Sequence, residues 1–173
     1  VNLGNSNTDT ISFIGKVDTD IVPTSDTLNL GSASASFGTF YGEATSARYA
    51  DLAEIYSADA DYEPGTVVKL GGSAEVTQTT SFNDPEVFGV VSTNPAYLMN
   101  SEAEGVAIAL TGRVPVKVEG RIKKGERIVS GSKPGFAKAL MKNEYDMRCI
   151  IGRALEDKET FDDDIVEVVI GVK

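Results

Sequence analysis

The chain has 173 residues, about the length of one domain or slightly more. Its 26 acidic and 16 basic residues give a formal net charge of −10, and it contains one Cys, no His and no Trp. This composition excludes a Ser-His-Asp triad, an imidazole metal site, an internal disulfide and a CxxC redox pair, and it argues against nucleic-acid binding, which requires clustered Lys and Arg.

Membrane insertion and cofactor chemistry are not expected from this sequence either. No apolar run approaches the roughly 18 residues that span a bilayer, and no signal-peptide pattern opens the chain. The first residue is not Met, so we expect a segment of a longer protein. Any chemistry must rest on carboxylates, hydroxyls, Tyr, Lys or Arg.

Residues 1–44 are rich in Ser, Thr, Asn and Gly and poor in large apolar side chains. Extended segments are predicted at 11–14, 20–23 and 37–41, with turns between them. This is too little apolar material to build a core within one chain. Composition alone also fits a disordered segment.

A short internal repeat argues for order in this part of the chain. Val1-Asn-Leu-Gly-Asn-Ser6 recurs as Leu28-Asn-Leu-Gly-Ser-Ala33, and an aromatic extended run follows each copy. Repeats that cannot close a core alone usually stack against neighbours. We therefore expect a fibre-shaft β segment in which three identical chains bury their apolar side chains together; the alternative is a chance likeness between two turns.

Residues 45–64 are expected to form a junction, with a short helix over 45–56 followed by an acidic linker. Thr45 or Ser46 can cap the helix, and Ala is frequent in it. Three apolar residues lie at helical spacing, namely Tyr49, Leu52 and Tyr56. A single turn between two β regions would fit the same residues.

From residue 65 to 173 the pattern is that of successive strands. The clearest signal is the alternation of apolar residues on either side of Gly112, from Val106 to Val118. Further strands are predicted near 65–70, 74–78, 88–93, 127–130, 149–152 and 164–170. The expected fold class is all-β: a thin trimeric β shaft segment followed by an antiparallel β-barrel or sandwich head, with one short helix at the junction.

Five segments of this amino-acid sequence are distinctive. They are Thr45-Ser-Ala-Arg-Tyr-Ala-Asp-Leu-Ala-Glu54, Tyr62-Glu-Pro-Gly-Thr-Val-Val68, Phe88-Gly-Val-Val-Ser-Thr-Asn-Pro95, Ala109-Leu-Thr-Gly-Arg-Val-Pro-Val-Lys-Val118 and Ile151-Gly-Arg-Ala-Leu-Glu156. Together they resemble the C-terminal module of bacteriophage tail fibres, and Ile21-Val-Pro-Thr-Ser-Asp26 and Leu28-Asn-Leu-Gly-Ser32 look like shaft repeats. The module is also similar to the autoproteolytic intramolecular chaperone domain of tailspike and neck-appendage proteins.

The resemblance implies a structural protein of a phage tail fibre, assembled in the cytoplasm of a host bacterium and carried in the virion. Its head would trimerise and cap the shaft, contact other tail or virion proteins and touch a host-surface receptor or glycan. Candidate receptor loops are 78–87, 96–104 and 156–164.

The resemblance also implies an alternative activity, a single-turnover self-cleavage near residues 45–50. The family's motif Asp-Tyr-Ala-Glu corresponds to Asp51-Leu-Ala-Glu54, with Leu52 at the position of the Tyr, and Ser46 is the candidate hydroxyl. On a helix Asp51 and Glu54 would lie about 5–6 Å apart on one face, where like charges split the two pKa values into an acid and a base. The alternative is a pair of solvated acids, with Arg48 as a partner of Asp51.

The remaining chemical candidates have simpler interpretations. Two acidic clusters, at 59–63 and 162–164, could supply oxygen ligands to calcium, but neither has EF-hand spacing and solvated turns explain both. Cys149 is expected to be a small buried apolar residue. The tyrosines at 41, 49, 56 and 62 are expected to gather at an interface, or at a sugar-binding surface if exposed.

Overall fold

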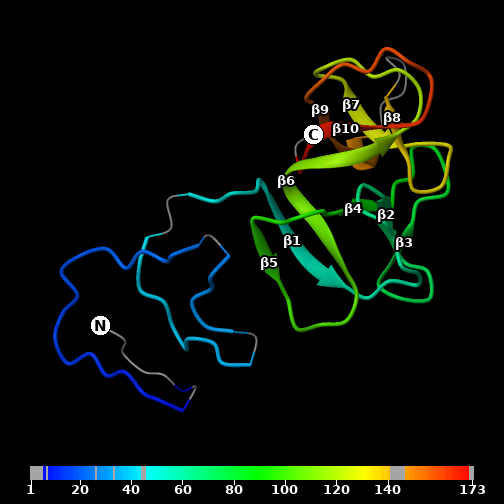
Figure 1. Cartoon of the computed structure of the whole chain (residues 1–173). Coiled ribbons are helices and arrows are strands. Elements are labelled where there is room, and N and C mark those ends of the chain that lie inside the picture. Colours follow the sequence, from blue (N-terminus) through cyan, green and yellow to red (C-terminus); the bar gives the residue numbers. More distant parts are fainter. Residues whose placement is uncertain are drawn as a thin grey trace. The chain divides into compact units, whose positions relative to one another are not determined.

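Figure 1 shows the computed structural model of the chain, which describes residues 6, 8–25, 27–32, 34–43, 46–140 and 147–171. The chain divides into two compact units, Val1–Glu43 and Ala44–Lys173. The described residues contain no helix that is both long and apolar enough to cross a membrane.

The first unit consists of turns and extended segments, and its described residues contain no strand longer than an isolated bridge. Two of its turns are built alike. The Ser6 hydroxyl lies 2.9 Å from that of Thr8, and the Ser25 hydroxyl lies 2.8 Å from that of Thr27. Such local hydroxyl bonds favour turns. The first copy of the repeat, residues 1–6, lies almost wholly outside the described residues.

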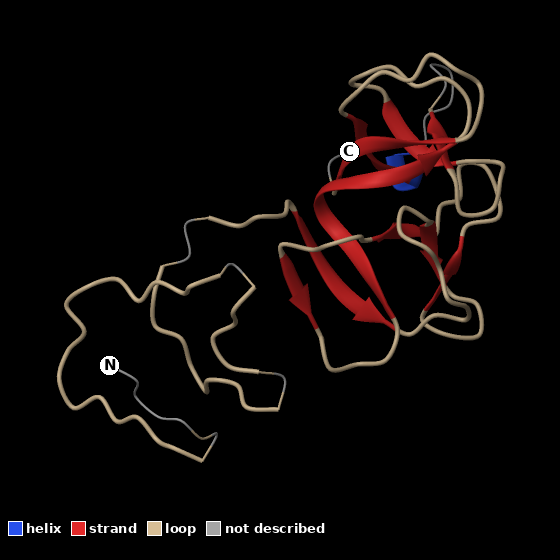
Figure 2. Cartoon of the chain, in the orientation of Figure 1, coloured by secondary structure: helices blue, strands red, loops and turns tan. Residues whose placement is uncertain are grey.

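The second unit is an all-β structure, as Figure 2 shows. Its strands are β1 (Asp51–Tyr56), β2 (Val67–Leu70), β3 (Val76–Gln78), β4 (Val87–Val91), β5 (Tyr97–Met99), β6 (Val106–Val118), β7 (Arg127–Ser130), β8 (Ala137–Ala139), β9 (Ile150–Ala154) and β10 (Asp164–Ile170). The helical part of its described residues is one short 3-10 segment, Met147–Cys149. The predicted all-β class is therefore confirmed.

Five strands, one of which is β6, pair in a ring and form a closed barrel. From β6 the order of neighbours runs through β10, β9, β7 and β8 and returns to β6. The N-terminal half of β6 pairs instead with β1 and β4. Strand β1 pairs in turn with β5, and β4 pairs with β2, which pairs with β3. One long strand thus joins a closed barrel to a smaller open sheet.

Gly112 marks the point where β6 passes from one partner to another. It is opposite Asp51 of β1 and also opposite Ile170 of β10. Its φ of +109° is unfavourable for residues with a side chain, and a Cβ there would overlap the carbonyl oxygen of Ala50. The close approach of three strands at this point therefore requires glycine.

The barrel interior holds the main core. Val114, Val116 and Val118 of β6 are fully buried, and so is Val168 of β10. Outward residues alternate with them, which explains the period of two in the sequence. Cys149 is buried at 1% exposure, as predicted for a small apolar residue.

The helix predicted over 45–56 is wrong, because residues 51–56 form strand β1 between β5 and β6. The apolar spacing that suggested a helix has a different origin. Tyr49 precedes the strand, whereas Leu52 and Tyr56 lie on one face of it at an even separation. Pairing with a strand more than fifty residues away overrides the local preference.

Candidate functional site

Asp51, the first predicted site residue, is buried at the start of β1. Its side chain is 5% exposed and accepts a hydrogen bond of 2.6 Å from the hydroxyl of Ser92. Its carbonyl oxygen accepts the N–H of Ala96 at 2.8 Å. A hydroxyl beside a carboxylate has the geometry of a nucleophile and its base, but Ser92 is itself buried at 7% exposure. In this conformation the pair ties the strand to the turn after β4.

Glu54, the second predicted residue, lies on the opposite face of the strand. Side chains three positions apart in a strand point to opposite faces. Glu54 is opposite Ile108 of β6 and accepts a hydrogen bond of 2.8 Å from the Tyr56 hydroxyl. Burial, together with this bond to Glu54, raises the pKa of Tyr56 to about 12. The paired carboxylates expected from a helical junction are therefore not formed.

Ser46, the third predicted residue, lies in an exposed segment before β1 and outside any strand. The structure thus places the three candidates in three environments: an exposed approach, a buried contact with Ser92, and a contact with Tyr56. It does not bring them together as one site.

A groove of about 310 Å³ lies beside Asp51, where the chain enters β1. Its charged lining residues are Arg48, Asp51, Arg113 and Glu167. Tyr49, Thr93 and Asn94 add hydroxyl and amide groups. Guanidinium, amide and hydroxyl groups around a shallow hollow can hold a polar ligand by hydrogen bonds.

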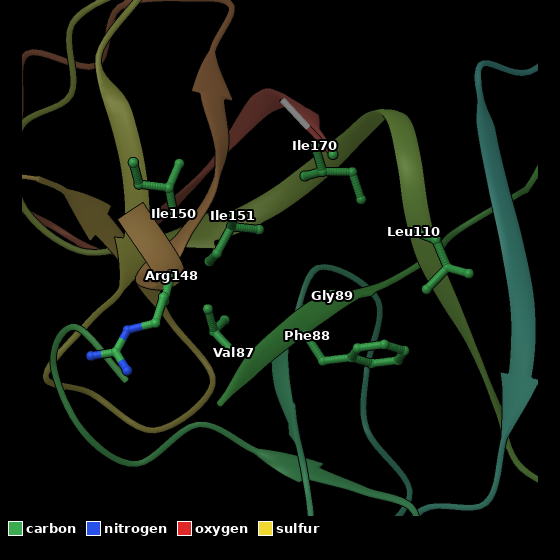
Figure 3. A pocket seen from close by; sticks show the side chains of 9 residues that line it. Val87, Phe88, Gly89, Leu110, Arg148, Ile150, Ile151 and Ile170 are labelled. Atoms are coloured by element: carbon green, nitrogen blue, oxygen red, sulfur yellow. The ribbon is translucent and has the colours of Figure 1, made fainter. Parts of the chain in front are cut away.

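A second cavity, of about 170 Å³, lies between the ends of β4, β9 and β10 and is shown in Figure 3. Phe88 and Leu110 line one side of it, and Ile151 and Ile170 lie across from them. Among the described residues that line it, Arg148 is the one that is ionisable. These residues offer one guanidinium and apolar walls, and no acid–base pair.

Neither acidic cluster forms a metal site in the described part of the chain, where no group of three or more His, Cys, Asp or Glu residues could hold an ion. Asp59 instead accepts a hydrogen bond from the Tyr62 hydroxyl, which lowers the pKa of Asp59. In the second cluster, the Asp163 carboxylate contacts the Lys133 ammonium.

The tyrosines and candidate receptor loops are only partly surface features. Tyr56 packs edge-on against Phe88 at 5.1 Å between ring centroids, and Tyr62 packs against the same apolar cluster. Tyr49 and Tyr41 are exposed. Of the loops, 96–104 contains strand β5, and 78–87 contains the buried Thr79 and Asp84.

The loop 156–164 is anchored by Lys158, a residue for which the sequence predicted no role. Lys158 is 5% exposed, and its ammonium donates to the carbonyl oxygens of Gly120 at 2.8 Å, of Thr160 at 3.0 Å and of Asp162. A lysine in an acidic surface loop gives no local sign of burial. The three carbonyl acceptors come together only because the loop folds back against Gly120.

No protein-family model matches this chain, and no curated protein does. The resemblance to tail-fibre modules therefore rests on the motifs of the sequence alone.

Proposed function

We propose that the chain is a structural protein of a phage tail fibre. In this proposal the first unit is a segment of a trimeric shaft, and the second unit is the head that trimerises and caps it. The protein is carried in the virion, and the head contacts other tail proteins and a host-surface receptor or glycan. The sequence motifs suggest the family, and one structural contrast supports the assembly.

The supporting observation is that the described residues of the first unit form no core of their own. Their large apolar side chains are between 50% and 101% exposed in the single chain. They are Ile11, Phe13, Ile14, Val17, Ile21, Val22, Leu28, Leu30, Phe37, Phe40 and Tyr41. By contrast, the second unit buries Val, Ile and Ala from its sheet and barrel. Soluble monomers rarely expose so many large apolar residues together.

Association with identical copies supplies the missing core. Burying one large apolar side chain stabilises a structure by roughly 1.5–3 kcal/mol, so these residues represent a large driving force. Because every copy carries the same side chains, a parallel assembly of copies buries them without a different partner. A closed head on each chain then sets the register of the shaft.

Light scattering combined with size-exclusion chromatography tests this function. We expect a trimer of the 173-residue chain at micromolar concentration. Replacing the exposed Phe13 and Phe37 by Ser should shift the mass toward the monomer without changing the stability of the head. The matched control is Phe161→Ser, an equally exposed phenylalanine on a loop of the second unit. A stable wild-type monomer would contradict the proposal.

A further inference from the structure

Among the described residues, one strand of the open sheet has no partner on its outer side. Every named strand other than β3 and β5 has a partner strand on both sides. The outer side of β3 is bridged at Val76, which bonds to the backbone of Ser57 and Asp59. Strand β5, Tyr97–Met99, pairs with β1 alone. Its outer N–H and C=O groups are therefore available for another strand.

The edge strand β5 has only one of the features that usually protect such an edge. Natural edge strands are very short or carry Lys, inward charges or Pro within the strand; β5 is short, with three residues, but reads Tyr-Leu-Met. No charged side chain occurs from Val87 to Ser101. Tyr97 is 66% exposed, so the edge presents an apolar ring to its surroundings.

The absence of charge favours another copy of this chain as the partner. Two copies of net charge −10 repel each other wherever their acidic residues face. The stretch 87–101 adds no charge of its own, although Glu54 of β1 lies opposite Met99. A like-charged copy therefore meets the least repulsion at the outer side of β5, away from Glu54. The first unit has a similar uncharged stretch at 27–42, which carries exposed Phe37, Phe40 and Tyr41.

Chain connectivity also limits where copies can meet. Strand β1, the partner of β5, begins at Asp51, eight residues after the end of the first unit at Glu43. Eight residues span at most about 29 Å. In an assembly that joins copies through their first units, this tether keeps the start of β1 in each copy within that distance of its own first unit.

We propose that a second copy of this chain adds an extended, uncharged segment to the outer edge of β5 as a further strand. Main-chain hydrogen bonds supply the affinity in this mode of recognition, and side chains on alternate positions supply the specificity. The inference rests on the proposed function, because it names the surface through which the head takes part in the assembly.

Hydrogen exchange and one charge substitution test this edge. In the wild-type protein, the amides of residues 97–99 should gain protection when the protein is concentrated from dilute to associated conditions. Tyr97→Lys places an ammonium at the edge, where it would lose hydration if a strand docks, and should weaken association about tenfold or more. Ile165→Lys is the control, since Ile165 is a similarly exposed apolar strand residue and lies opposite Lys117 of β6.

The outcomes separate this inference from the function on which it rests. Weaker association of Tyr97→Lys with normal association of Ile165→Lys, together with protected β5 amides, supports the edge. If the wild-type protein associates but its β5 amides exchange freely and Tyr97→Lys associates normally, the edge inference is wrong and the proposed function stands. A monomeric wild-type protein overturns both.

Discussion

Replacing Gly112 by Ala tests whether residues 51–56 form a strand against β6. In the structure Gly112 has a φ of +109°, and an added Cβ would overlap the carbonyl oxygen of Ala50 and lie 2.8 Å from the Cα of Asp51. If residues 45–56 formed a helix, these two atoms would not be held there by strand pairing. The loss of folding stability caused by Gly112→Ala therefore depends on whether β1 is formed.

The destabilisation expected for Gly112→Ala has two parts, backbone strain and steric overlap, and a substitution at a second glycine with positive φ separates them. Gly125 has a φ of +86°, and no atom lies within 4 Å of an added Cβ. Gly125→Ala thus reports the backbone strain alone, about 1–2 kcal/mol. Gly112→Ala adds overpacking, typically about 1–3 kcal/mol, and weakens the 3.2 Å bond from the Arg113 N–H to Ala50. We expect a total of about 3–5 kcal/mol.

Urea denaturation of both variants measures these free energies of unfolding. The expected result is a much lower midpoint for Gly112→Ala than for Gly125→Ala, at an unchanged slope. If the two variants lose the same stability within about 0.5 kcal/mol, the contact between β1 and Gly112 is absent and the argument for a strand at 51–56 fails.

Three further predictions concern single side chains. The pKa of Tyr56 is raised from 10.0 to about 12 in the folded protein. The protonated Tyr56 hydroxyl therefore contributes its full stabilisation below pH 10, and this stabilisation is lost as the pH rises to about 12. Over this pH range, the urea midpoint of Tyr56→Phe should fall less than that of the wild type. Lys158→Met leaves the carbonyl oxygens of Gly120, Thr160 and Asp162 without their shared ammonium donor and should lower the free energy of unfolding by about 1–3 kcal/mol. A thermal midpoint equal to that of the wild type would contradict this role of Lys158. Self-cleavage near residues 45–50 stays a prediction that intact-mass spectrometry tests: Asp51→Ala and Glu54→Ala should keep full length if the wild type cleaves, and a wild type that also stays intact after prolonged incubation rules out the activity.

The strands that line the barrel were predictable, because burial on one face forces a period of two in the sequence. Residues 164–170 and the run around Gly112 are the examples, and both were predicted as strands that the structure contains. Three-residue strands such as β5 and β8 are too short to show this period. They form because longer neighbours offer them a pairing edge.

The candidate site was much less predictable, because its contacts are not local. Ser92 is 41 positions from Asp51, and no spacing rule connects them. The motif placed Asp51 and Glu54 near each other in sequence, which suggested a shared site. Whether two residues three positions apart share a face depends on the secondary structure, and pairing with β6 decided it.

The position of the last strand in the ring sets an order of events during synthesis. The barrel cannot close until β10 is available to join β6 to β9. At synthesis rates of about 5–20 residues per second, the roughly 130 residues between Glu43 and Ile170 take on the order of 6–25 s. Throughout that interval the exposed apolar side chains of the first unit have already been made, while the barrel has not closed. In the proposed assembly, the first units of neighbouring nascent chains can therefore meet before their barrels have closed.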